Sequence, residues 1–120
     1  MESQTRVFNS AAFIRPSDFT PIRSVVLETP DSVVIVWHVA PGQEIAAHHH
    51  PAGQDTWTVL SGSADYYLGG GRQQPLKAGD IAIARPGELH GAVNRGDSPF
   101  VFVSVVSSNQ AGYILGEQQG

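Results

Sequence analysis

The chain has 120 residues, a net charge of −4 and no cysteine, which excludes disulfide bonds and thiolate metal ligands. It has no basic stripe to support nucleic-acid binding and no apolar run of about 18 residues that would span a membrane. The length predicts one domain, residues 1–120, around one core. We expect mobile tails at 1–6 and 116–120 and, without an apolar leader, a cytoplasmic location.

Short runs of apolar and β-branched residues alternate with glycine and proline turns along the chain. No helical period of convincing length appears. In chain order, the strands that we predict are Ile22–Thr29, Ser32–Ala40, Glu44–His50, Asp55–Ser61, Ala64–Leu68, Gln73–Leu76, Ile81–Ala84, Leu89–Asn94 and Pro99–Val106. Many short strands with regular turn signals predict an all-β fold, a sandwich or barrel of the jelly-roll kind.

The third predicted strand ends in three consecutive histidines. Side chains alternate along a strand, so His48 and His50 point to one face and His49 to the other. Their α-carbons would lie about 6.6 Å apart, a spacing at which two imidazoles can bind one metal ion. Asp55 opens the next strand, and His90 lies in a later segment framed by glycine and proline. A surface histidine cluster is the alternative, but this combination favours a metal site.

The same residues resemble the two sequence motifs of the cupin superfamily. The first motif, G-x5-H-x-H-x(3,4)-E-x6-G, is matched by Gly42, His48, His50, Asp55 and Gly62. The second, G-x5-P-x-G-x2-H-x3-N, is matched by Gly79, Gly87, His90 and Asn94. All spacings are kept, but Asp55 replaces the glutamate and Arg85 stands at the proline position.

The resemblance implies a small double-stranded β-helix barrel, usually dimeric, with a metal held by three histidines and one glutamate. Carried over, the ligands of this chain are His48, His50 and His90, with Asp55 in place of the glutamate. The metal would be a divalent transition metal: Fe, Mn, Ni, Zn or Cu. Since the superfamily includes oxygenases, isomerases, decarboxylases, sugar-binding regulators and storage proteins, the fold alone does not select a reaction.

The fourth ligand is left open because Asp55 is one methylene shorter than glutamate. Alternation places Asp55 on the face of Trp57, whereas Gln54 belongs to the predicted loop, so we expect Asp55 to be the ligand. Gln54 or a water could take its place. Asp55 would then be a strand-start carboxylate that accepts hydrogen bonds from the nearby backbone.

We predict a pocket beside the metal, lined by Trp57, Tyr66, Phe102 and Ser104. Plain core packing is an equal alternative for Trp57, and Ser104 has no base nearby in sequence that would make it a nucleophile. His38 lies in the most apolar strand, where we expect a core histidine with its hydrogen bonds satisfied; a role in the pocket is the alternative.

These features favour a mononuclear metal enzyme, oxygenase-like, that acts on a small and largely apolar or aromatic molecule. A non-catalytic small-molecule-binding or sensor module that uses the same pocket is the alternative. Because Val33–Val39 is apolar on both faces, one small barrel cannot bury all of its apolar surface, and we also expect a homodimer.

Overall fold

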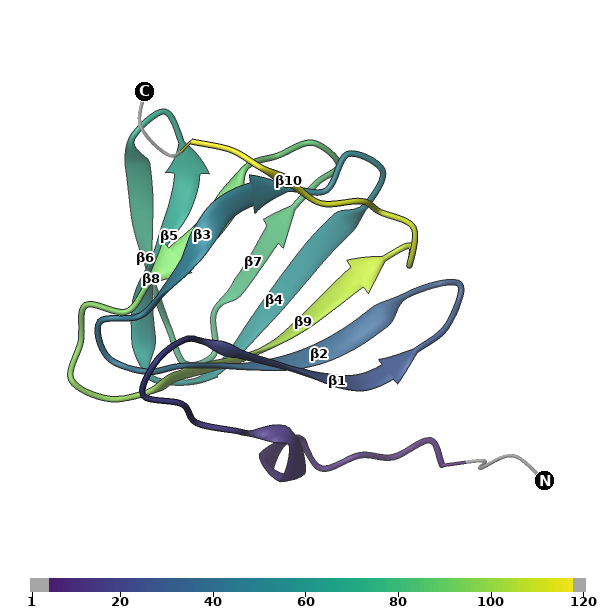
Figure 1. Cartoon of the computed structure of the whole chain (residues 1–120), viewed down its shortest axis with the longest axis horizontal. Helices are drawn as coiled ribbons and strands as arrows, with labels where there is room; N and C mark the ends of the chain where they lie inside the picture. The colour runs from purple at the N-terminus through teal and green to yellow at the C-terminus, as the bar shows by residue number, and fades with distance from the viewer. Residues whose placement is uncertain (1–4, 118–120) are drawn as a thin grey trace.

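The computed structural model describes residues 5–117, in which ten strands form two antiparallel sheets that face each other (Figure 1). The strand order is β1-β2-β9-β4-β7 in the first sheet and β10-β3-β8-β5-β6 in the second. This arrangement confirms the predicted all-β fold. Residues 1–4 and 118–120, which make up most of the expected tails, lie outside the described residues.

Strand boundaries follow the turn signals to within one or two residues. The first sheet consists of β1 (Ile22–Glu28), β2 (Val33–Val39), β4 (Gln54–Ser61), β7 (Ile81–Ala84) and β9 (Phe100–Ser107). The second consists of β3 (Glu44–His49), β5 (Ser63–Gly69), β6 (Arg72–Lys77), β8 (His90–Val93) and β10 (Ile114–Leu115), the last of which the sequence did not predict. A single turn of 3-10 helix, η1 (Ser10–Phe13), lies beside β1, and residues 5–117 contain no helix long and apolar enough to cross a membrane.

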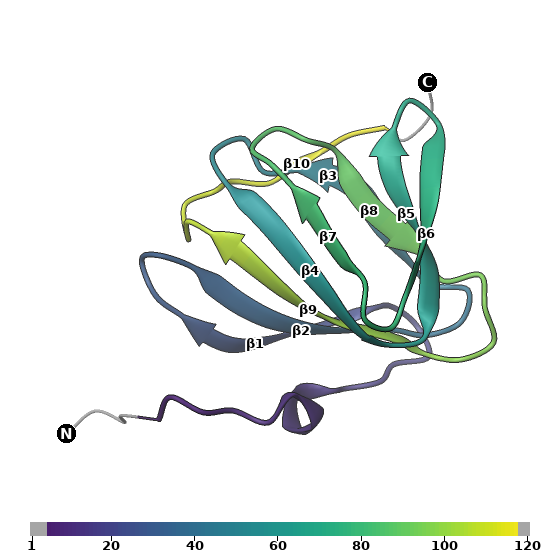
Figure 2. The same cartoon turned by 180° about the vertical axis from the view of Figure 1, so that it is seen from behind.

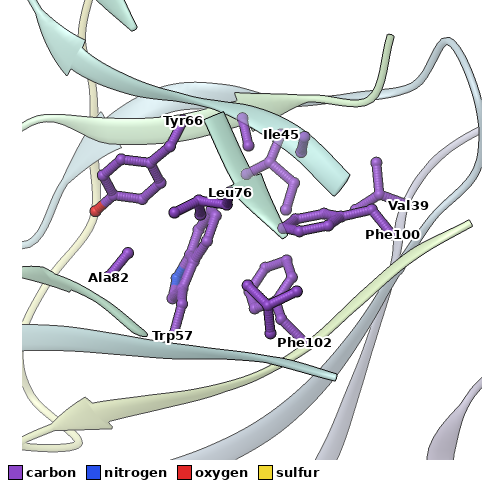
Figure 3. Packing of buried hydrophobic residues seen from close by; sticks show 11 residues of the cluster. Val39, Ile45, Trp57, Tyr66, Leu76, Ala82, Phe100 and Phe102 are labelled. Carbon is purple, nitrogen blue, oxygen red and sulfur yellow. The ribbon is translucent and has the colours of Figure 1, made fainter. Parts of the chain in front are cut away.

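The core lies between the sheets, and aromatic rings are its largest side chains (Figure 3). Trp57 stacks on Phe102 with ring centroids 4.0 Å apart, and its edge meets Tyr66 at 5.2 Å. Burial of such rings supplies the largest apolar areas in a core. The cluster is completed by Val39, Ile45, Val59, Ala64, Leu76, Ala82, Ala92 and Phe100.

The register of the first sheet decides which side chains reach the space between the sheets. Trp57 lies opposite Ser104 on one side and Ala82 on the other, and all three are buried. Asp55, two residues before Trp57, therefore points inward as well. The alternation that the sequence predicted for this strand is present.

His38 departs from its expected environment. Its side chain is buried, but its Nδ1 atom has no hydrogen-bond partner among the described residues. The register places it between Ile22 and Val101, whose side chains offer no acceptor or donor. The prediction of a fully satisfied core histidine is therefore wrong, because the neighbouring strands present apolar residues at this position.

The turn between β4 and β5 depends on Gly62. This residue has a φ of +75°, and a Cβ atom there would lie 2.0 Å from the carbonyl oxygen of Pro99. Gly70 has a comparable φ of +62°, but a Cβ atom there would meet nothing within 4 Å. The two glycines therefore separate the effect of backbone strain from that of a steric clash.

We expect Gly62→Ala to lower the free energy of unfolding by about 3 kcal/mol or more, from left-handed strain and overpacking together. Gly70→Ala should lower it by only about 1 kcal/mol, because it adds the strain alone. Urea unfolding followed by circular dichroism measures both values. Equal losses in the two variants would show that the approach to Pro99 is not a tight contact.

Candidate metal centre

Four buried side chains from both sheets converge at one end of the core. One ligand atom from each of His48, His50, Asp55 and His90 lies within 4.8 Å of the others. His48 in β3 and His90 in β8 are direct cross-strand partners, and His50 follows the end of β3. Asp55 comes from β4 in the facing sheet. The cluster therefore spans the gap between the two sheets.

An irregularity in β3 brings the histidines into register. The pairing of β3 with β8 shifts between Ile45 and His48, so that His48 lies opposite His90 with ring centroids 4.2 Å apart. The backbones approach closely here, since a Cβ atom on Gly91 would lie 2.7 Å from the carbonyl oxygen of Ile45. A β-bulge of this kind bends the strand and changes the direction in which the side chains after it point.

A backbone carbonyl fixes the orientation of each imidazole. His48 Nδ1 lies 2.7 Å from the carbonyl oxygen of Ala46, and His50 Nδ1 lies 2.7 Å from that of Gly112. His90 Nδ1 lies 3.1 Å from the carbonyl oxygen of Glu88. A carbonyl oxygen can only accept, so each Nδ1 must carry the proton and donate. In the neutral ring, Nε2 is then a lone-pair donor to a metal.

The Nε2 atoms face a carboxylate rather than a hydrogen-bond donor. Asp55 Oδ2 lies 3.0 Å from His90 Nε2 and 3.3 Å from His50 Nε2. With neutral rings, these contacts bring lone pairs together in a buried space, which is unfavourable unless a proton or a cation lies between them. Three imidazole nitrogens and one carboxylate oxygen are the donors that first-row divalent ions accept. The residues therefore fit a divalent transition metal.

Ser104 holds the carboxylate in place. Its hydroxyl donates to Asp55 Oδ1 over 2.5 Å, which leaves Oδ2 for the histidines. Burial acts to raise the pKa of Asp55, but the hydrogen bonds that His50 and His90 can donate when Nε2 is also protonated, together with the one from Ser104, outweigh it and hold this pKa well below its usual range. Asp55 is thus ionised among neutral imidazoles, and an ionised carboxylate is the form that binds a metal cation.

Gln54 does not compete for this position. It is the first residue of β4 rather than part of the loop that the sequence predicted. Its side-chain amide donates to Thr56 Oγ1 over 3.4 Å, on the face of the strand opposite Asp55. The alternation within β4 thus separates the two candidate side chains.

The histidines differ in how readily they take a proton. Burial, together with the neighbouring His90, lowers the pKa of His48 to about 4. The hydrogen bond with Asp55 raises the pKa of His50 in spite of its burial. A metal therefore competes with protons at His50 first, and metal affinity should decline as the pH falls through this raised pKa.

A cavity of about 620 Å³ opens beside His48, His50 and Asp55, whereas His90 does not line it. Trp57 and Ser104 line it, whereas Tyr66 and Phe102, which the sequence also placed in the pocket, do not. Phe102 lies between Trp57 and Trp37, and Tyr66 is part of the buried cluster, so both pack in the core. The cavity is otherwise mainly apolar, with walls that include Val33, Ile35, Trp37, Ile45 and Val106.

The C-terminal segment closes one side of the centre, which the sequence did not indicate. Residues 114–115 pair with the end of β3, and Tyr113 stacks on His48 with ring centroids 4.8 Å apart. The same segment supplies the Gly112 carbonyl that holds His50. His49, predicted to face away, is half-buried and lies opposite Ile114. No local pattern shows that a short segment 62 residues after His50 returns to it.

Residues 35–106 match the family model of the cupin domain, which is more than half of the chain. The chain belongs to the cupin family. An uncharacterised conserved protein with a double-stranded β-helix domain from Klebsiella pneumoniae has 61% identity, covers 95% of this chain and 99% of its own, and superimposes with a TM-score of 0.91. The double-stranded β-helix expected from the motifs is thereby confirmed.

More distant similarities are to proteins with different names. The polyketide cyclase RemF from Streptomyces resistomycificus has 17% identity and a TM-score of 0.79, over 95% of this chain and 87% of its own. An oxalate-binding protein from Thermotoga maritima is 29% identical over 66 residues, 55% of this chain and 54% of the relative. The chain thus spans about half the length of that curated relative.

The roles of Asp55 and Gln54 can be separated by metal titration. Asp55→Ala should weaken the binding of a divalent metal by at least 10–100-fold, because it removes the anionic donor, whereas Gln54→Ala should leave affinity unchanged. Asp55→Glu should keep or improve affinity. Titration of the three metal-free variants with Zn²⁺ at one fixed pH compares them. An unchanged affinity in Asp55→Ala, with a sharp gain in Asp55→Glu, would assign the native fourth position to water.

Proposed function

We propose that this protein is a mononuclear metal enzyme that acts on a small, largely apolar or aromatic molecule, with an oxygenase reaction as the function that the site supports best. The observation behind it is the convergence of three imidazoles and Asp55 beside a mainly apolar cavity. Absence of cysteine suits a reducing compartment such as the cytoplasm, where we expect it to act.

Each part of the site has a distinct task in this proposal. His48, His50 and His90 would hold the ion through Nε2, and Asp55 would hold it through Oδ2. Once bound, a divalent transition metal supplies Lewis-acid chemistry and, for iron, copper or manganese, redox chemistry. His48, His50 and Asp55 line the cavity, so a molecule bound against its apolar walls can reach the ion.

A second candidate is a non-catalytic module that binds a small molecule through the same metal. The name of the Thermotoga maritima relative, oxalate-binding protein, favours this alternative. The two candidates require the same metal and the same cavity. They differ only in turnover, and therefore in whether dioxygen is consumed.

Metal content provides the first test. Protein purified without a tag should contain about one divalent transition metal per chain by elemental analysis. Replacing His50 or His90 with alanine should abolish stoichiometric binding, because each change removes an Nε2 donor. His49→Ala is the matched control and should retain the metal, since the ring of His49 lies outside the cluster. Full metal content in the His50/His90 double variant would place the site elsewhere.

Oxygen uptake then separates the enzyme from the binding module. Iron- or manganese-loaded protein is offered a panel of phenols and diketones, and uptake is followed with an oxygen electrode. The enzyme proposal predicts uptake with at least one compound and none with the His90→Ala variant. Ligand binding without uptake across the panel would favour the binding module.

We also propose a homodimer formed through the outer face of the first sheet. Figure 2 shows its five strands side by side. Two rows of outward side chains cross the sheet in register, and neither contains a charge: Ile83, Thr56, Val105, Val34 and Leu27; Ile81, Thr58, Val103, Val36 and Ser24. Ile81 is 62% exposed and Ile83 is 55% exposed. Val36 and Ser24, at one end of the second row, are buried, so the exposed part of the face lies towards Ile81 and Ile83. Exposed apolar side chains gathered across one sheet are typical of an interface.

Light scattering tests this proposal directly. The protein at micromolar concentration should have twice the chain mass of 12.8 kDa. Ile81→Lys together with Ile83→Lys should yield monomers, because two charges would be buried without partners. A monomer mass for the unmodified protein across salt conditions would contradict the homodimer.

A further inference from the structure

Arg23 is the basic residue of the cavity lining, and it has no partner among the described residues. It lies in the edge strand β1, opposite Trp37, and both side chains line the same cavity. Within residues 5–117, no hydrogen bond or ion pair engages its guanidinium group. By contrast, Arg85 pairs with Glu88, and Arg95 pairs with Asp65.

Arg23 borders the same cavity as the metal donors. The lining of that cavity includes His48, His50 and Asp55 as well as Arg23. Glu28 is the acidic residue of the cavity wall apart from Asp55, and it lies at the other end of β1, opposite Val33. The two charges therefore do not neutralise each other, and the wall between them is apolar.

The centre and Arg23 together favour a negatively charged ligand. A divalent ion held by neutral imidazoles and Asp55 keeps a net charge of about +1, and Arg23 adds a second positive charge on the wall of the same cavity. A guanidinium group also matches the geometry of a carboxylate, which it can bind through two N–H groups. A single arginine provides too little charge for a phosphate ester with two negative charges, since the cavity lining contains no other lysine or arginine.

We propose that the natural ligand is a small organic monoacid whose carboxylate is bound by Arg23 and whose apolar or aromatic body lies against Trp37 and Ile35. This inference rests on the proposed function, because it names the class of molecule that the metal site acts on. Arg23 is then the residue that selects an acid over a neutral molecule of the same shape.

The test compares acids with their uncharged counterparts. Zn²⁺-loaded protein is titrated with benzoate, phenylacetate and 3-phenylpropanoate, and with the amide of each, by calorimetry and by the fluorescence of its two tryptophans, both of which line the cavity. At least one acid should bind about 10-fold more tightly than its amide. Arg23→Gln should weaken the binding of that acid about 5- to 10-fold and leave its amide unchanged.

Two control variants make the outcome specific. Arg23→Lys keeps the charge and should retain part of the preference for the acid, while Glu28→Gln removes the opposite charge from the same strand and should not weaken acid binding. Zinc content should be unchanged in all three variants. The inference is overturned if no acid binds more tightly than its amide, or if Arg23→Gln binds acids as the unmodified protein does.

Failure of the metal proposal gives a different result. Protein that takes up no zinc would contradict the proposed metal function. The acid and amide titrations on that metal-free protein would still decide the role of Arg23, because a preference for the acid that Arg23→Gln abolishes would support it.

Discussion

Three backbone carbonyls determine the chemistry of this site. Each accepts a hydrogen bond from the Nδ1 atom of one histidine, at Ala46, Gly112 and Glu88. The proton is thereby placed on the outer nitrogen of each ring, and the inner nitrogen is directed towards Asp55. A buried group of acceptors is unfavourable by itself, so the arrangement is stable only when a proton or cation completes it. A divalent ion satisfies all four side chains at once.

The rest of the fold positions these carbonyls and Asp55 around the site. Two of the carbonyls are two residues away from their histidines, so the local backbone of β3 and of the turn before β8 is sufficient to position them. The third arrives from the C-terminal segment, and Asp55 arrives from the facing sheet. A bound ion would therefore connect the two sheets and the C-terminal segment. We expect its binding free energy to contribute to the stability of the whole barrel.

The sequence predicts the site better than its surroundings, for a physical reason. His48 and Asp55 lie on two short strands and His50 directly follows the first of them, so the alternation of side chains and the spacing to the turn glycines decide which residues face inward. The placement of Phe102 and Tyr66 depends on how aromatic rings share the space between the sheets. Alternation shows that they point inward but not whether they fill the core or border a cavity.

Other features depend on contacts between distant segments, which no local pattern reveals. Arg23 lies on an edge strand before the motifs begin, and Tyr113 lies after they end, so only the strand order brings them to the metal centre. The unsatisfied Nδ1 of His38 reflects the apolar residues that flank it on two neighbouring strands. The family motifs thus identify the metal donors, whereas residues outside the motifs complete the lining of the cavity.

The protonation of the three ligand histidines is the most direct test of this account. Two-bond ¹⁵N–¹H correlation spectra of metal-free protein, at a pH above the raised pKa of His50, should show His48, His50 and His90 with the proton on Nδ1. Addition of Zn²⁺ should then shift the Nε2 resonances of all three. A proton on Nε2 of any of these rings, or a zinc shift at Nδ1, would show that the carbonyls do not set the tautomer and would contradict the account.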